Sequence, residues 1–215
     1  MKKIVALLPM KENSERVPNK NFKLLGGKPL YQWILDSLCQ IECIDNIVIN
    51  TDSENILNRA FNNKKIILRK RNSKICGDFV SMNKVIEDDV MKIHSDIYVM
   101  THTTNPFLSS KTIQDSIDDF VRSKNDSLFT VNKYQTRFYD TSGKAINHDL
   151  NKLERTQDLD PYYEENSCLY IFSRKSFLEH QNRIGNNPIM KEIPKIESID
   201  IDDMEDWHLA EKIAN

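Results

Sequence analysis

Three basic side chains lie close together in the loop that follows the first apolar run of the chain. In LLPMKENSERVPNKN, residues 7–21, Lys11, Arg16 and Lys20 surround Ser14. Cations and a hydroxyl just past the end of a strand are suited to hold an anion by charge-assisted hydrogen bonds. The chain has only five glycines and neither common glycine-rich phosphate motif, so a phosphate site must depend on side-chain cations. A solvated run of charges would look similar, and this alternative stays open for the loop taken alone.

A pair of aspartates near the C-terminus forms the second chemically distinctive group. In SIDIDDMEDW, residues 198–207, Asp200 and Asp202 alternate with isoleucines, so in an extended segment both carboxylates point to one face. Neighbouring carboxylates repel each other unless a cation compensates, and Mg²⁺ prefers one or two carboxylates plus substrate phosphates. An acidic helix start explains the acids at 203–206 but not this pair. We therefore predict that Asp200 and Asp202 bind Mg²⁺.

The cationic loop and the aspartate pair are informative together. If they face one cavity, the loop cations hold a triphosphate while Mg²⁺ bridges its oxygens. Such an arrangement stabilises the charge that develops in phosphoryl or nucleotidyl transfer. The sequence therefore favours an enzyme of that class.

The apolar pattern indicates which elements position these groups. Short apolar runs alternate with amphipathic stretches, which predicts βαβ units and an α/β fold with a mainly parallel sheet covered by helices. Ligands bind at the carboxyl ends of such strands, which points to the loops 10–23, 70–80 and 101–108. The predicted strands are 3–9, 46–51, 65–69, 96–101, 127–133 and 168–173, and the predicted helices are 29–42, 53–62, 81–93 and 109–123, with a final strand and helix within 196–214.

Residues 134–166, the arm segment, break this alternation. The segment is polar and dotted with aromatic residues. Loops of this length without structure of their own are uncommon unless functional. A plain surface loop is one interpretation, and an arm that covers a substrate or a second subunit is the other. We expect one domain over residues 1–215 with 134–166 as the arm.

Bulk properties restrict the partners. The 215 residues carry 30 basic and 32 acidic side chains, so no field of one sign favours a nucleic acid or a membrane surface. No stretch is long enough to cross a bilayer, and the apolar run at the N-terminus lacks a signal-peptide cleavage site. Four scattered cysteines suit reduced thiols. We expect a cytoplasmic protein that acts on small molecules.

Six sequence blocks resemble one known family. PMKENSERVPNKN, residues 9–21, resembles the signature P-[AM]-[RK]-x-x-S-x-R-x-P-x-K-N of the cytidylyltransferases that activate acidic sugars, the acylneuraminate (sialic acid) and Kdo synthetases. Together the blocks cover nearly the whole chain. The later blocks follow in the family's order: VINTDS at 48–53, LRKRNSKICGDFVSMN at 68–83, THTTNPFL at 101–108, RTQDLDPYYEENSCLY at 155–170 and SIDIDDMEDWHLAE at 198–211.

The resemblance implies a three-layer α/β/α, Rossmann-like fold of the nucleotide-diphospho-sugar transferase type and a role for each matching residue. CTP is the implied nucleotide substrate and Mg²⁺ the implied cofactor. The implied nucleotide-binding residues are Lys11, Ser14, Arg16, Lys20, Asn21, Arg71, Asp78 and Ser81. The implied sugar-binding residues are His102, Thr104, Arg155, Gln157, Asn166 and Tyr170. The implied catalytic residues are Lys11, Arg16, Lys20 and Asp202, and the implied metal ligands are Asp200 and Asp202. An ion pair of Arg155 with Glu154 or Asp158 is the alternative to a sugar contact.

Several positions depart from the family pattern. Lys11 stands where arginine is usual, which removes a planar fork for phosphate. Glu15 stands where lysine is common, and we expect it to turn away from a triphosphate. Ser167 replaces a frequent glycine, which raises the question of its backbone conformation. No acid lies between Thr101 and Pro106, which favours the nine-carbon acylneuraminate branch over the Kdo branch.

The expected reaction joins CTP to a nine-carbon 2-keto acid sugar of sialic, legionaminic or pseudaminic type, giving a CMP-sugar and pyrophosphate. A Kdo-type synthetase, a glycosyltransferase with a D-x-D metal pair and a nucleotide-binding module without turnover remain alternatives. The resemblance also implies a homodimer in which each arm segment lines the partner's sugar site.

Overall fold

A seven-stranded sheet forms the centre of the molecule in the computed structural model, which describes residues 2–214. The strand order is β5-β4-β1-β6-β8-β7-β9. β8 runs antiparallel to both of its neighbours, and the other pairings within this sheet are parallel. The strands are β1 Ile4–Met10, β4 Asn46–Thr51, β5 Ile66–Lys70, β6 Ile97–Thr101, β7 Ser127–Tyr134, β8 Tyr162–Ser173 and β9 Pro188–Glu192. The predicted mainly parallel sheet is confirmed.

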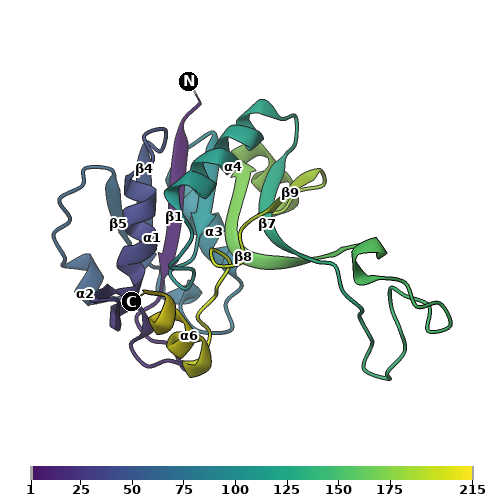
Figure 1. Cartoon of the computed structure of the whole chain (residues 1–215). Helices are drawn as coiled ribbons and strands as arrows, with labels where there is room; N and C mark the ends of the chain where they lie inside the picture. The colour runs from purple at the N-terminus through teal and green to yellow at the C-terminus, as the bar shows by residue number, and fades with distance from the viewer. Residues whose placement is uncertain (1, 215) are drawn as a thin grey trace.

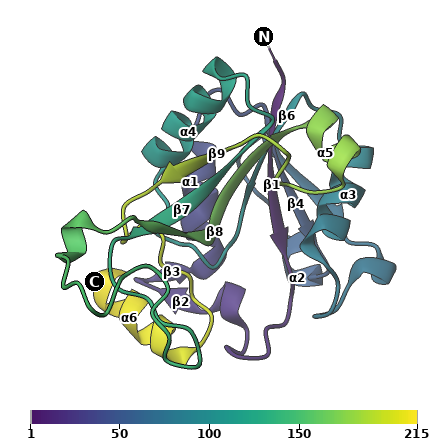
Figure 2. The ribbon, with the colours of Figure 1, turned by 90° about the vertical axis from the view of Figure 1, so that its right-hand side faces the viewer.

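Helices cover both faces of this sheet. Figures 1 and 2 show α1 and α4 on one face and α3 and α5 on the other. None of the described helices is both long and apolar enough to span a membrane. The helices are α1 Leu30–Cys39, α2 Glu54–Leu57, α3 Met82–Lys92, α4 Ser110–Arg122, α5 Arg174–His180 and α6 Met204–Ala214. The predicted three-layer α/β/α architecture is confirmed.

The side-chain alternation of β1 explains why both faces are covered. Ala6 and Leu8 pack into the core cluster that contains α1 and α4, whereas Val5 and Leu7 pack into the cluster on the α3 side. All of β1 is buried, as expected for a central strand with helices on both faces. Ser109 caps α4 by accepting a hydrogen bond from the backbone N–H of Thr112.

Two predicted elements differ from the structure. The helix expected over 53–62 is the single turn α2, because Asn58 and the asparagines at 62 and 63 favour turns over helix. The final strand expected near 198–202 is absent, and the last strand is β9. Ile201 is instead fixed by burial and by a hydrogen bond from its N–H to the carbonyl of Thr104 at 2.9 Å.

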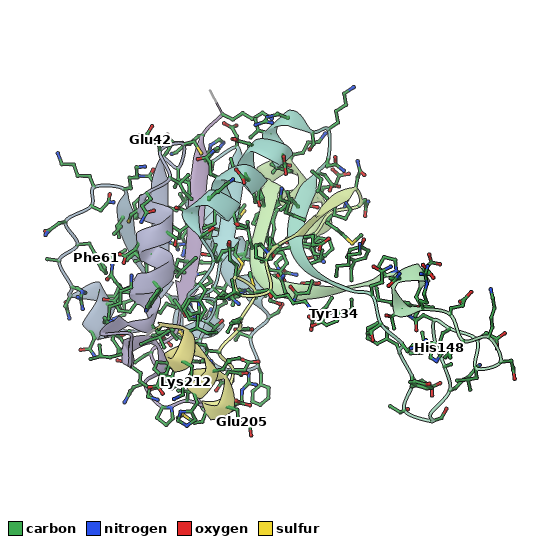
Figure 3. The ribbon with its side chains drawn as sticks, in the orientation of Figure 1. Glu42, Phe61, Tyr134, His148, Glu205 and Lys212 are labelled. Carbon is green, nitrogen blue, oxygen red and sulfur yellow. The ribbon has the colours of Figure 1, made fainter. Side chains whose placement is uncertain are left out.

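The arm segment projects from the end of the sheet (Figure 1). β7 and β8 stay paired as far as Tyr134 and Tyr162, and Figure 3 shows Tyr134 at the base of the projection and His148 within it. An irregularity in the pairing follows Phe129, and beside it Ser167 adopts a φ of 58°. Such irregularities bend a ribbon of two strands, and here the bend marks where the ribbon leaves the sheet.

Candidate active site

A cavity of about 390 Å³ opens at the carboxyl ends of β1 and β6. The loops 10–23, 70–80 and 101–108 contribute to its wall, as the rule for open α/β sheets predicts. Asp202 reaches the same cavity from the C-terminal part of the chain. The predicted site residues that line it are Lys11, Ser14, Arg16, Lys20, Asn21, Arg71, Asp78, His102, Thr104 and Asp202.

A small hydrophobic cluster brings the cationic loop and the aspartate pair together. Val17 of the loop is fully buried in this cluster, next to Leu25 and Leu30. Ile201, which precedes α6, and Trp207 of α6 are fully buried there as well. Figure 3 shows α6, which carries Glu205 and Lys212, lying across the lower end of the molecule. The residues that flank the aspartates in sequence are therefore packed directly against the residues that flank the loop cations.

Ion pairs join the two groups across this cluster. Arg16 Nη2 lies 2.7 Å from Asp202 Oδ1, and Lys20 Nζ lies 4.0 Å from the same oxygen. Lys20 also donates a hydrogen bond to the carbonyl of Ile201 at 2.6 Å. Burial lowers the pKa of Lys20, and the charges of Asp202 and Asp200 act in the opposite direction. The structure thus places the loop cations and the aspartate pair at one site.

Asp200 lies behind Asp202 and does not line the cavity. Its Oδ1 is buried and has no hydrogen-bond partner. Burial raises the pKa of Asp200, Asp202 raises it further, and a hydrogen bond with Thr104 and the charge of Lys20 oppose the shift. An orphaned carboxylate oxygen beside a second carboxylate is suited to a cation. The residues from 2 to 214 offer no cluster of three His, Cys, Asp or Glu for a metal, so substrate oxygens or water would have to complete the shell.

Arg71 is held rigidly at the end of β5. Its Nε donates to Asn50 Oδ1 at 3.0 Å, and its Nη2 donates to the carbonyls of Asn50 at 2.8 Å and Met10 at 3.3 Å. Asn50 is fully buried and donates in turn to Asp89 Oδ1 at 2.9 Å. Asp89 pairs with Arg69. The guanidinium of Arg71 therefore reaches the cavity in a fixed orientation.

Asn21 connects two of the loops that form the cavity. Its Nδ2 donates to the carbonyl of Lys11 at 2.7 Å, and its Oδ1 accepts from Thr103 Oγ1 at 2.6 Å. The side chain is buried. These bonds hold the cationic loop against the loop after β6, so Asn21 has a structural task besides its predicted nucleotide contact.

At the rim of the cavity, acidic residues lie next to Lys11. Lys11 forms an ion pair with Asp78, and this contact is the main reason that the pKa of Asp78 lies below its usual value. Glu15 also lines the cavity, so the prediction that it turns away is wrong. Ser81 directly precedes α3 and lies outside the wall, although Val80 and Met82 on either side of it contribute to the wall.

Of the predicted sugar residues His102 and Tyr170, His102 lines the cavity and Tyr170 does not. Burial lowers the pKa of His102 to about 3, and Arg183 contributes to this shift, so the imidazole is neutral at physiological pH. Tyr170 is fully buried, and burial raises its pKa to about 12. Its hydroxyl donates to Glu165 and accepts from Arg183 Nη2 at 3.0 Å.

The remaining predicted sugar residues do not meet the cavity within one chain. Arg155 and Gln157 lie in the projecting arm segment, where Arg155 Nε donates to Asp158 Oδ2 at 2.7 Å. This ion pair is one of the alternatives that the sequence left open. Asn166 accepts from Thr130 and donates to Asn132, which stabilises the irregular pairing of β7 and β8.

Comparison with known proteins decides the family. A family model described as cytidylyltransferase matches residues 5–213. The chain belongs to the cytidylyltransferase family. The resemblance inferred from the six sequence blocks is thereby confirmed, and the protein is a nucleotidyltransferase.

Relatives of this cytidylyltransferase match it over nearly its whole length. It is 27% identical to the CMP-N,N'-diacetyllegionaminic acid synthase of Legionella pneumophila, covering 98% of this chain and 96% of the relative. It is 23% identical to a pseudaminic acid cytidylyltransferase of Campylobacter jejuni, covering 97% and 94%. A solved CMP:2-keto-3-deoxy-manno-octonic acid synthetase in complex with CTP superposes with a TM-score of 0.71 at 15% identity, covering 98% of both chains, which shows a shared fold.

Three residues near the site of the cytidylyltransferase were not predicted from its sequence. Asn50 and Asp89 orient Arg71, and Arg183 contacts Tyr170. Asn50 could have been noticed in the sequence, because its polar amide side chain interrupts the apolar run of β4. Asp89 and Arg183 look like ordinary surface charges in the sequence, and only the packing of α3 and of the loop after α5 brings them inward.

Proposed function

We propose that this cytidylyltransferase joins the CMP part of CTP to a nine-carbon 2-keto acid sugar of sialic, legionaminic or pseudaminic type and releases pyrophosphate. The anomeric hydroxyl of the sugar attacks the α-phosphorus in line, and the bond to the β,γ-pyrophosphate breaks. The names of the two relatives, both acting on nine-carbon acidic sugars, support this acceptor class. The observation that carries the proposal is the meeting of Arg16 and Lys20 with Asp202 in one cavity.

The cations of the cavity bind the triphosphate in this proposal. Lys11, Arg16 and Lys20 offset the phosphate charges and stabilise the departing pyrophosphate, while Ser14 and backbone amides add hydrogen bonds. Arg71 is orientated before the nucleotide arrives, because its hydrogen bonds to β1 and β4 fix its guanidinium. Asp78 and Ser81 contact the nucleoside at the rim. The ion pairs of Lys11 with Asp78 and of Arg16 with Asp202 hold both cations at the cavity, and these pairs must open when the phosphates of CTP bind.

Asp200 and Asp202 hold Mg²⁺ in this proposal. Bound there, the ion neutralises phosphate charge and polarises the α-phosphate. Two carboxylates with the rest of the shell left to substrate and water match the known preference of Mg²⁺. Asp202, which pairs with Arg16, and the Asp200 oxygen that has no protein partner would be the protein's ligands to the ion.

His102, Thr104 and Tyr170 border the sugar side in this proposal. His102 acts as a neutral hydrogen-bonding group, because burial keeps the proton off its second nitrogen. Arg155 and Gln157 belong to the segment that projects away from the protomer, whereas Asn166 lies at its base, bonded to Thr130 and Asn132. Arg155 of the partner subunit reaches the sugar only in the homodimer that the family resemblance implies. The four cysteines are free, which fits a cytoplasmic enzyme.

A panel assay tests the proposal. The protein is incubated with CTP, MgCl₂ and, in parallel, N,N'-diacetyllegionaminic, pseudaminic, N-acetylneuraminic and Kdo sugars. The expected result is release of pyrophosphate and a CMP-sugar mass with at least one nine-carbon acid. Turnover with Kdo alone would support a Kdo-type synthetase. A glycosyltransferase would give no product in this mixture and would instead consume an added nucleotide sugar without releasing pyrophosphate. Tight CTP binding without turnover of any acid would support a nucleotide-binding module.

A further inference from the structure

Among residues 2–214, no cation that lines the cavity is left over for the substrate's carboxylate. The four cations that line the cavity are Lys11, Arg16, Lys20 and Arg71, and all four are needed on the nucleotide side. Val80, Met82 and Val85 give another part of the wall an apolar surface. A carboxylate brought against apolar groups without a cation is strongly disfavoured. The predicted partner, Arg155, lies in the arm segment with its side chain 71% exposed and paired to Asp158.

Arg183 stands next to this region with unused hydrogen-bond donors. Its guanidinium lies over the ring of Tyr170, 3.8 Å from the centroid, and its Nη2 donates to the Tyr170 hydroxyl at 3.0 Å. Glu165 approaches to 3.6 Å, which is beyond a normal hydrogen bond. Within residues 2–214, Nε and Nη1 of Arg183 have no hydrogen-bond partner. Its side chain is only 19% exposed, so few of these donors are satisfied by bulk water.

The loop after α5 holds Arg183 in this place. Asn182 accepts hydrogen bonds from the backbone N–H of Ile184 at 3.2 Å and from Asn83 Nδ2 on α3 at 3.3 Å. α3 begins with Met82, which lines the cavity. The charge of Arg183 also disfavours the protonated form of His102 in the cavity wall. Arg183 is not itself among the residues that line the cavity, but its loop is bonded to the start of α3, where Met82 lines the cavity together with His102. These contacts hold Arg183 beside that part of the cavity.

We infer that Arg183 binds the carboxylate of the acidic sugar through its free Nε and Nη donors and so makes the enzyme select 2-keto acids. The inference rests on the proposed function and names the group that recognises the acid. A guanidinium fork binds a carboxylate through two parallel hydrogen bonds. The stacking of Arg183 on Tyr170 orients that fork before the substrate arrives, which lowers the ordering cost of binding.

Steady-state kinetics of four proteins test this inference. The wild type is compared with Arg183→Gln, Arg183→Lys and Arg155→Gln, the last being the matched loss of an arginine in the arm segment. KM is measured for CTP and for the nine-carbon acid with the highest turnover in the panel assay. The 1-carboxamide of that acid serves as a substrate without the negative charge. Thermal melting and CTP titration by calorimetry report whether each variant is folded.

Arg183→Gln is expected to raise KM for the acid by at least about tenfold, because a charge-assisted bidentate contact is lost. KM for CTP is expected to stay within about twofold of the wild type, since Arg183 does not touch the nucleotide side. The preference of the wild type for the acid over its carboxamide should collapse toward unity. Arg183→Lys should keep part of that preference, because it keeps the charge without the fork.

Three outcomes would overturn the inference. Unchanged KM for the acid in Arg183→Gln would do so, as would an acid-to-carboxamide preference that survives in Arg183→Gln. A loss of the acid preference in Arg155→Gln but not in Arg183→Gln would assign the carboxylate to the arm segment instead. If the wild type turns over none of the panel acids, the proposed function fails and this inference fails with it. If the wild type turns over a nine-carbon acid and Arg183→Gln has the same KM and the same acid preference, only this inference fails and the proposed function stands.

Discussion

Asn50 is the link through which the protein core orients Arg71, and Asn50→Ala tests that link. The substitution removes the hydrogen bond that Asn50 accepts from Arg71 Nε at 3.0 Å and the one that it donates to Asp89 at 2.9 Å. The two main-chain hydrogen bonds of Arg71 to residues 10 and 50 remain. Arg71 thus keeps its place but loses the bond that fixes the plane of its guanidinium.

The size of the effect follows from the charges involved. Each lost hydrogen bond has one charged partner, and Asn50 itself is fully buried; hydrogen bonds to charged groups contribute roughly 1.5–3 kcal/mol. We therefore expect Asn50→Ala to lower the free energy of unfolding by about 3–5 kcal/mol. We expect KM for CTP to rise by about tenfold, because a loosened guanidinium pays an ordering cost on binding.

Urea unfolding and CTP-dependent kinetics measure these two effects. Asn125→Ala is the matched control, because Asn125 also donates from its side-chain amide, to the carbonyl of Asn187 at 3.1 Å, but at an exposed site away from the cavity. That control is expected to lose no more than about 1 kcal/mol and to keep the KM for CTP. If Asn50→Ala matched the control in both measurements, the orienting role of Asn50 would be refuted.

Three further predictions concern buried groups and backbone strain. Burial raises the pKa of Asp89 from 3.8 to about 6. Between these two pH values the native state retains a proton that the unfolded chain releases, so the free energy of unfolding falls by up to ~3 kcal/mol as the pH rises from about 4 to 6. Asp89→Asn should remove this fall in urea midpoints measured across that range. Burial lowers the pKa of His102 from 6.5 to about 3, so stability should decrease as pH falls below about 6.5, and His102→Gln should abolish that decrease. Ser167→Gly should raise the free energy of unfolding by about 1 kcal/mol in the same assay, because Ser167 has a φ of 58°, which glycine adopts without strain. For each of the three variants, urea midpoints that match those of the wild type would contradict the prediction made for that variant.

The pattern of apolar runs was sufficient to predict the sheet and its layers. β1 is apolar on both faces, which requires helices on both sides, and the strands at 46–51 and 96–101 were predicted with their observed positions to within one residue. The strand β9 was missed because PIMKE has only a weak alternation and is stabilised by pairing with β7. The alternating pattern around Ile201 predicted a strand, but no neighbouring strand pairs with this segment. Ile201 is buried because it packs in the same cluster as Trp207.

The part of the site built from loops was predictable, whereas the part built by packing was not. Arg16 and Asp202 could be paired from charge alone, because an anion site and a metal site are complementary. The direction of Arg155 could not be predicted, since it depends on how far the ribbon of β7 and β8 bends away from the sheet after Thr130. Arg183 is invisible to such reasoning because its contact with Tyr170 joins a loop to the middle of a buried strand.

Calorimetric titration of CTP with and without Mg²⁺ tests the central claim, that Asp202 joins the loop cations and the metal at one site. Asp202→Asn is compared with Asp203→Asn, which makes the same charge change one residue later at the cap of α6, where Asp203 accepts from the backbone of Glu205 at 2.8 Å. We predict that Mg²⁺ tightens CTP binding by about tenfold or more in the wild type and in Asp203→Asn, and that Asp202→Asn loses this enhancement. An equal enhancement by Mg²⁺ in Asp202→Asn would contradict the claim.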